Sequence, residues 1–145
     1  MFPDTPSVEQ LSQVIAQVTG PAFLLGAVAA FVSVLISRMN RIIDRSQALN
    51  AIKDDSEKAQ LKSDIPRLKR RAALLNSAIF FSTLSAIVTC LLVIVAFVSA
   101  YFNVRHEYGV GVLFMLALAF FSASLVNLAR ETRIALHEYD HFSTS

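Results

Sequence analysis

The sequence predicts an all-α integral membrane protein, a single membrane domain over residues 1–145 with three transmembrane helices. Three runs without charge indicate the spans: Gln10 to Ser37, Ala72 to Val104 and Tyr108 to Ala129. A helix needs about 20 apolar residues to cross a bilayer, and each run reaches that length. Hydrophobic residues make up 54% of the chain and charged residues 17%, below the roughly 25% of soluble domains. A soluble domain of this size would not bury three such helices on all sides.

The segment boundaries follow from these runs and from the charges between them. The predicted segments are an N-terminal amphipathic helix (5–19), the first span (21–37), a cytoplasmic helical hairpin (38–71), the second span (74–101), the third span (108–129) and a cytoplasmic tail (130–145). No Lys or Arg precedes the first run, so it is interpreted as a span and not as a cleaved signal peptide.

The N-terminal segment carries a helix-start signal. Thr5 is a capping residue type, and Pro6 suits the first helical position. Apolar residues then recur at intervals of three and four, at Val8, Leu11, Ile15 and Val18. This pattern predicts an amphipathic helix on the outer membrane surface. Gly20 and Pro21 are expected to break that helix before the first span begins.

The distribution of basic residues predicts the orientation. The segment from Arg38 to Arg71 holds ten Lys or Arg, whereas the N-terminal segment holds none. The connection between the second and third spans has only Arg105, and the tail has Arg130 and Arg133. Short loops rich in Lys and Arg stay on the cytoplasmic side. The N-terminus is therefore predicted outside and the C-terminus in the cytoplasm.

The loop between the first two spans is predicted to form a helical hairpin. Its descending arm has an apolar stripe formed by Met39, Ile42, Ile43, Leu49 and Ile52, and its return arm has one formed by Leu61, Ile65, Leu68 and Leu75. Asp54, with Glu57 three residues later, resembles a capping box that would start the return helix. Pro66 either kinks that helix or marks a second start.

A belt of charged residues is predicted to border the membrane on its cytoplasmic side. Its members are Arg38, Arg41, Asp44 and Arg45 on the descending arm and Arg67, Arg70 and Arg71 on the return arm. The arginines follow the apolar run and do not interrupt it, which disfavours a voltage sensor. In one interpretation Asp44 binds arginines of the other arm or of a neighbouring subunit and fixes how the hairpins dock. In the other, Asp44 is solvated and the net positive charge attracts anionic headgroups.

Small and polar residues gather on one face of the second span. Ser82, Ser85 and Thr89 lie there with neighbouring alanines. Such a face either packs against other helices of the chain or lines a water path between subunits. Asn76 and Asn127, each about a turn inside the cytoplasmic boundary, are the deepest amides, and we expect them to bond each other or a neighbour.

The residue types and motifs in the sequence disfavour several classes of function. No Asp, Glu, Lys, Arg or His lies inside a span, which disfavours a proton relay or a coupled transporter. The stretch HEYDH, residues 137–141, matches a zinc-protease pattern, but the only further carboxylate near it is Glu131, a weak third ligand. It is interpreted as an exposed polar tail, with no catalytic, cofactor-binding or metal-binding residue and no enzyme activity. The basic cluster has no interleaved aromatic residues, so no nucleic-acid partner is expected.

The stretches SRMNRIIDRSQAL and RLKRRAALLNSAI, each beside an apolar span, resemble the bacterial membrane proteins grouped as domain of unknown function 2721. The R-x-x-D-R core at Arg41, Asp44 and Arg45 is the most specific part of the resemblance. It covers residues 10–136, so the HEYDH stretch is expected to lie outside it. The resemblance implies a three-span protein of the bacterial inner membrane and implies no activity.

Two functional hypotheses follow from these observations. The first is a homo-oligomeric channel for an ion or small solute, with Ser82, Ser85 and Thr89 facing a path between subunits. Three helices cannot enclose such a path alone, so this function requires an oligomer. The alternative is a non-conducting scaffold or regulatory subunit whose basic hairpin binds anionic lipid or a partner protein.

Overall fold

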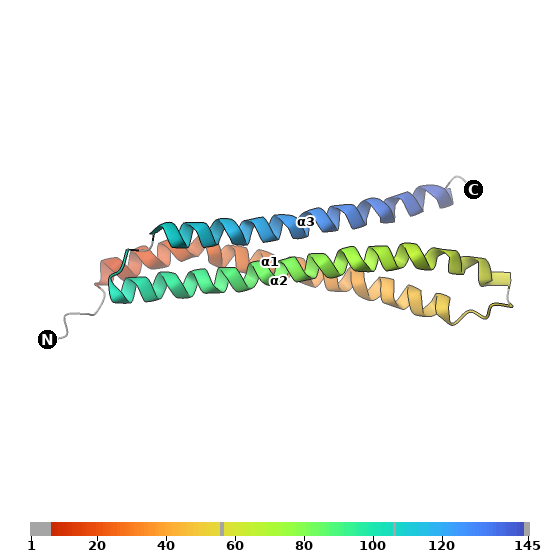
Figure 1. The fold of residues 1–145 in the computed structure, drawn as a ribbon, viewed down its shortest axis with the longest axis horizontal. Helices are drawn as coiled ribbons and strands as arrows, with labels where there is room; N and C mark the ends of the chain where they lie inside the picture. The colour runs from red at the N-terminus through yellow and green to blue at the C-terminus, as the bar shows by residue number, and fades with distance from the viewer. Residues whose placement is uncertain (1–6, 56, 106, 144–145) are drawn as a thin grey trace. The chain divides into compact units, whose positions relative to one another are not determined.

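Three long helices make up most of the protein. A computed structural model describes residues 7–55, 57–105 and 107–143. Its elements are α1 (Val8–Asn50), a 3₁₀ segment η1 (Glu57–Asp64), α2 (Ile65–Phe102) and α3 (Glu107–Ser143) (Figure 1). Each of these helices is long and apolar enough to cross a membrane, which confirms the prediction of an all-α chain with three helices that could span a bilayer.

The apolar surface of these helices points outward. Only 17%, 28% and 11% of the most apolar stretches of the three candidate spans are buried inside the chain. On α2 the exposed side chains include Phe80, Ile87, Leu91, Ile94 and Val98. An apolar surface this extensive suits hydrocarbon and not water, which disfavours the alternative of a soluble chain with a buried core.

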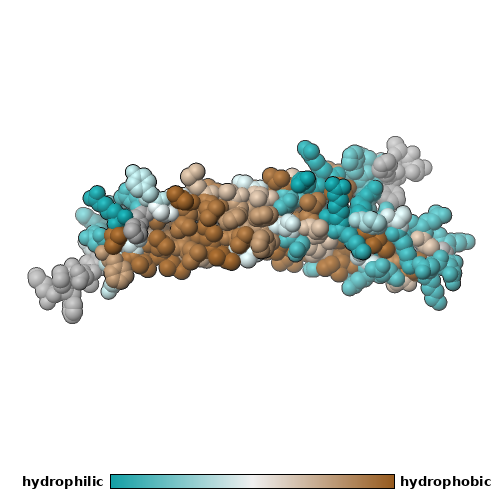
Figure 2. Space-filling model, in the orientation of Figure 1, coloured by the Kyte–Doolittle hydropathy of each residue, from teal (hydrophilic) through white to brown (hydrophobic). Residues whose placement is uncertain are grey.

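The chain divides into two compact units, each built from part of every long helix. The first contains Met1–Phe31 and Phe81–Ser122, and the second contains Val32–Phe80 and Ala123–Ser145. On the face shown in Figure 2, the side chains of the first unit are mostly hydrophobic. Hydrophilic side chains gather in the second unit, around the connection between α1 and α2.

Helix α1 starts at a cap that sequence inspection missed. The Gln10 backbone N–H donates to Ser7 Oγ at 3.2 Å, and the Ser7 N–H donates to Gln10 Oε1 at 3.1 Å. This reciprocal pair is a capping box, which satisfies two backbone donors at the helix start. The predicted start at Thr5 and Pro6 lies outside the described residues.

The predicted break at Gly20 and Pro21 is wrong, because α1 runs through both residues without interruption. A proline inside a helix removes one backbone hydrogen bond, a cost that neighbouring helices can offset in an apolar setting. Pro21 is itself buried, so packing holds the helix together at this point. Val14 is the buried residue of the N-terminal segment, whereas Val8 and Ile15 of the predicted stripe are exposed.

The connection between α1 and α2 differs from the predicted hairpin. The apolar stripes bury Ile42 and Leu49 on α1 and Leu68 and Leu75 on α2. The expected stripe residue Leu61 lies in the 3₁₀ segment and is exposed. The return α-helix begins at Ile65, which places Pro66 in the first turn, where a missing N–H breaks no helical bond.

The expected capping box at Asp54 and Glu57 is also wrong. Asp54 Oδ1 instead accepts a hydrogen bond of 2.7 Å from Lys62 Nζ. This hydrogen bond and the charge of Lys62 hold the pKa of the Asp54 carboxyl below its ordinary value. The carboxylate therefore closes the loop onto η1 and caps no helix.

The small face of α2 packs inside the chain. Ala78, Ser82, Ser85 and Thr89 have no exposed surface. In the first unit, Ser85 Oγ donates to the Ala117 carbonyl of α3 at 2.7 Å. In the second unit, Ser124 Oγ of α3 donates to the Ala78 carbonyl at 2.6 Å. Small residues let the two backbones approach closely enough for these bonds.

Candidate functional site

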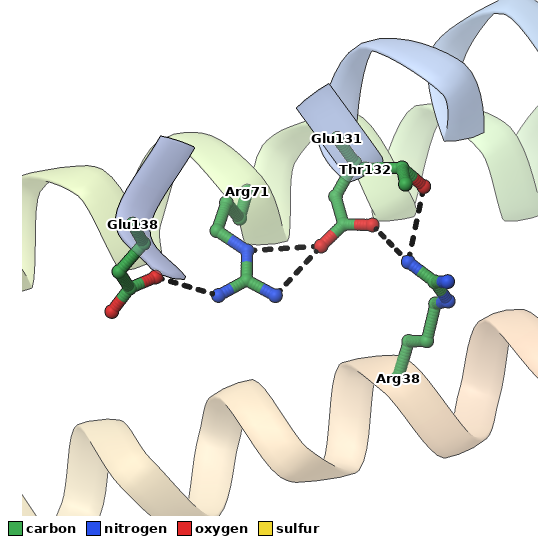
Figure 3. A network of polar contacts seen from close by, with 5 residues as sticks. All are labelled: Arg38, Arg71, Glu131, Thr132 and Glu138. Carbon is green, nitrogen blue, oxygen red and sulfur yellow. Dashed lines mark hydrogen bonds and ion pairs between the residues drawn. The ribbon is translucent and has the colours of Figure 1, made fainter. Parts of the chain in front are cut away.

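A buried carboxylate on α3 is the centre of the candidate site. Glu131 has no exposed surface, and its two oxygens bind arginines from two other helices (Figure 3). Arg38 Nη1 of α1 donates to Glu131 Oε2 at 2.8 Å. Arg71 of α2 donates to Glu131 Oε1 from Nε and Nη2, both at 2.9 Å. One side chain therefore ties three helices together by charged hydrogen bonds, which are the stronger kind.

Two further groups on α3 complete the network. Thr132 Oγ1 lies 3.1 Å from Arg38 Nη1, and Glu138 Oε2 lies 3.3 Å from Arg71 Nη1. Two arginines face two glutamates, so the formal charges balance. The side chains of Arg71 and Glu138 are 17% and 13% exposed, whereas that of Arg38 is 37% exposed. Water therefore reaches the network mainly from the Arg38 side.

The sequence positions explain why these groups meet. Arg38 is the first charge after the uncharged run of α1, and Arg71 is the last charge before that of α2. Glu131 is the second residue after the uncharged run of α3. Glu138 follows Glu131 by seven residues, two helical turns, and so lies on the same face. All four charges therefore lie near the ends of apolar runs.

Burying a carboxylate alone would cost several kcal/mol. Glu131 avoids most of this cost because each oxygen accepts a hydrogen bond from an arginine. The partners are complementary only in one register of the three helices. We therefore read the network as a device that fixes helix register in the second unit, a role best attested for buried polar groups elsewhere.

The C-terminal segment belongs to helix α3 and takes part in the network, although His137, Tyr139 and Asp140 of the HEYDH stretch are exposed, as expected of a polar tail. Helix α3 continues through residue 130 as far as Ser143, and it contributes Glu131, Thr132 and Glu138 to the network. Glu138, the base that a zinc-protease pattern would need, is bound by Arg71. His137 is exposed, and the side chain of His141 lies outside the described residues. Within the described residues no three His, Cys, Asp or Glu are placed to hold a metal.

The predicted belt divides into inward and outward residues. Arg38 and Arg71 turn inward to Glu131, and Arg45 Nη2 lies 3.9 Å from Asp64 Oδ2. Three other belt arginines, Arg41, Arg67 and Arg70, are exposed.

Asp44 does not dock onto the return arm, so that part of the hypothesis is wrong. The side chain of Asp44 is exposed, and no ion pair joins it to any described residue. Asp44 follows Arg38 by six residues, about 120° around the helix, and so turns away from the face that binds Glu131. A contact with a neighbouring subunit stays a prediction.

The other predicted site residues lie in different surroundings. Ser82, Ser85 and Thr89 are buried within the chain, as the packing interpretation expects. Thr89 Oγ1 donates to the Ser85 carbonyl of its own helix at 2.7 Å. Asn76 is exposed and Asn127 is half-buried. No hydrogen bond joins these two amides in the part of the chain that the structure describes.

Fold and site together define a membrane-type protein with three candidate spans, tied in one unit by a buried arginine–glutamate network. The chain belongs to the family described as "Protein of unknown function (DUF2721)", whose model matches residues 18–141. This confirms the predicted resemblance and corrects its limits, because the match includes residues 137–141 and leaves out most of residues 5–19. No curated protein and no solved structure matches the chain.

Proposed function

We propose that this protein is a non-conducting scaffold of the bacterial inner membrane that binds anionic phospholipid headgroups. In this proposal the connection between α1 and α2 and the end of α3 lie in the cytoplasm, and the N-terminus lies outside. The Lys and Arg asymmetry between the connections supports that orientation. The protein catalyses no reaction and needs no cofactor in this proposal.

The observation that carries the proposal is a set of outward-facing bases in the second unit, here called the outer belt. All six are exposed and have no ion pair with any residue that the structure describes: Arg41, Arg67, Lys69, Arg70, Arg130 and Arg133. Each lies within about three turns of the end of an uncharged run. A base near an anionic membrane surface is attracted by about 1 kcal/mol. Six such bases together strongly favour contact with a membrane leaflet that contains anionic lipids.

The burial of the small polar residues favours the scaffold over the channel. Ser82, Ser85 and Thr89 have no exposed surface within a single chain. To line a path between subunits they would have to leave their contacts within the chain, including the Ser85 bond to Ala117. The face of α2 left for a homo-oligomer is the bulky one that contains Ile87 and Ile94. We retain a homo-oligomer as part of the proposal, with this face as its contact.

Neutralising the outer belt should reduce the binding of anionic lipid. We expect the triple variant Arg41→Gln/Arg67→Gln/Arg70→Gln to retain far less phosphatidylglycerol than the parent, because about 3 kcal/mol of surface attraction is removed, which is about a hundredfold in affinity. The measurement is native mass spectrometry after release from nanodiscs containing equal amounts of phosphatidylglycerol and phosphatidylcholine. The same spectra give the number of subunits.

Two single variants act as controls. Lys53→Gln removes a base in the loop beyond the belt and should leave retention unchanged. Asp44→Asn removes the lone acid of the belt and should raise retention of phosphatidylglycerol. Equal retention by the parent and the triple variant would refute lipid binding by the outer belt.

The orientation has its own test. A cysteine placed at Asn103 in a Cys90→Ala background should react with a membrane-impermeant maleimide on intact cells, and one placed at Asn50 should not. The reason is the excess of Lys and Arg between α1 and α2. Labelling at Asn50 and protection at Asn103 would reverse the proposed topology.

A further inference from the structure

The first unit contains a cavity of about 530 Å³, where the start of α1, the end of α2 and the start of α3 come together. Ligand pockets typically measure about 300–1,000 Å³. Part of its lining is apolar, formed by Val14, Leu92, Ala96, Val110 and Phe114. The rest is polar and includes Gln13, Gln17, Asn103, Arg105 and Glu107. A cavity with two such parts suits a ligand with an apolar and a polar end.

The two glycines in the lining show that the space is open. A Cβ built at Gly20 or Gly111 meets no atom within 4 Å. Three apolar side chains in the lining, Val14, Leu92 and Ala96, are buried, with exposures of 8%, 1% and 6%. The apolar part therefore has both the room and the lining for a hydrocarbon chain.

The polar rim is shaped by the connection between α2 and α3. Asn103 adopts a left-handed conformation, with φ of 54°, and the Val104 N–H donates to the Ser99 carbonyl at 3.0 Å. This is a Schellman ending, which terminates α2 and reverses the chain. It brings Arg105 and Glu107, of opposite charge, to the rim beside the amides of Gln13 and Gln17. A rim with one cation, one anion and neutral amides complements a zwitterion.

The cavity lies where the apolar runs end. The uncharged run of α2 ends at Val104, and that of α3 begins at Tyr108. Tyr101, Phe102 and Tyr108 are 58%, 68% and 92% exposed beside it. Aromatic residues of this kind gather where hydrocarbon meets headgroups. The amphipathic molecule available at that depth is a membrane lipid.

We propose that this cavity is a binding site for a zwitterionic phospholipid of the phosphatidylethanolamine class. One acyl chain enters between Val14 and Leu92. The phosphate is bound by Arg105 and the glutamine amides, and the ammonium group by Glu107. A second hollow of about 300 Å³, lined by apolar and aromatic side chains, shares Ala100 with the cavity and offers a place for the other chain. The site is independent of the outer belt, which belongs to the other unit.

Filling the cavity should remove this binding without unfolding the protein. Gly111→Leu places a side chain in open space inside the lining and replaces a poor helix former. Gly109→Leu is the matched control, because Gly109 is on the same helix, has equally open surroundings and does not line the cavity. Delipidated protein is titrated with dioleoyl-phosphatidylethanolamine, and the bound fraction is measured by native mass spectrometry. We expect Gly111→Leu to bind about tenfold more weakly than Gly109→Leu, which corresponds to about 1.4 kcal/mol.

The headgroup is tested by repeating the titration with dioleoyl-phosphatidylglycerol. This lipid should bind Gly111→Leu and Gly109→Leu equally, because its binding depends on the outer belt. Glu107→Gln should weaken phosphatidylethanolamine binding several-fold and leave phosphatidylglycerol binding unchanged. Equal binding of phosphatidylethanolamine by the two glycine variants would overturn the site. An equal loss of both lipids in Gly111→Leu, or no effect of Glu107→Gln, would overturn the zwitterionic headgroup.

Discussion

Replacing Glu131 by glutamine is expected to lower the free energy of unfolding by about 3 kcal/mol, because it leaves two arginines facing a neutral, buried side chain. The value is at the lower end for a broken buried pair, since the Arg38 side chain is 37% exposed and reaches water. The measurement is unfolding of the purified protein in mixed micelles with increasing sodium dodecyl sulfate, followed by circular dichroism. No other single neutralisation in the described part of the chain should cost as much.

A double-mutant cycle distinguishes the loss of this network from nonspecific destabilisation of the fold. Glu131→Gln and Arg71→Gln should cost less together than the sum of the two single changes, because both break the hydrogen bonds between Arg71 and Glu131. Glu138→Gln is the matched control, since its carboxylate makes one contact of 3.3 Å with Arg71, and it should cost about 1 kcal/mol. An unfolding midpoint for Glu131→Gln equal to that of the parent would show that the network contributes no net stability.

The second large effect is expected at Ser85. Ser85→Leu should destabilise the protein by about 2–4 kcal/mol, because a bulky side chain overpacks the contact between α2 and α3 and removes a buried hydrogen bond. The Ser85 hydroxyl has no exposed surface and donates to the Ala117 carbonyl at 2.7 Å. The same micelle unfolding assay measures the change.

Ser85→Leu also distinguishes the scaffold from the channel. If Ser85 faced a path between subunits, leucine would block ion flux into liposomes and leave the fold intact. Cys90→Leu, which also introduces leucine but at an exposed position of α2, should change stability by less than about 0.5 kcal/mol. Ion flux through the parent protein, blocked by a stable Ser85→Leu variant, would favour the channel.

The sequence by itself determined the all-helical fold, the three candidate spans and the face of α2 on which Ser82, Ser85 and Thr89 lie. These are local properties, because the length of an apolar run and the 3.6-residue period are set within one helix. The family resemblance was likewise carried by short stretches beside the apolar runs, and the family model matches residues 18–141.

Only the tertiary structure decided which residues the belt and the small face contact. The hydrogen bonds of Glu131 join residues 93 and 60 positions apart, and such pairings depend on how three helices pack. From sequence, Glu131 was one more carboxylate in a polar tail and Asp44 the lone acid among arginines. In the structure, Asp44 lies on a different side of α1 from Arg38 and is exposed to solvent, whereas packing of the helices buries Glu131 between Arg38 and Arg71. The continuity of α1 through Pro21 was decided in the same way, by contacts around a buried proline that no local pattern encodes.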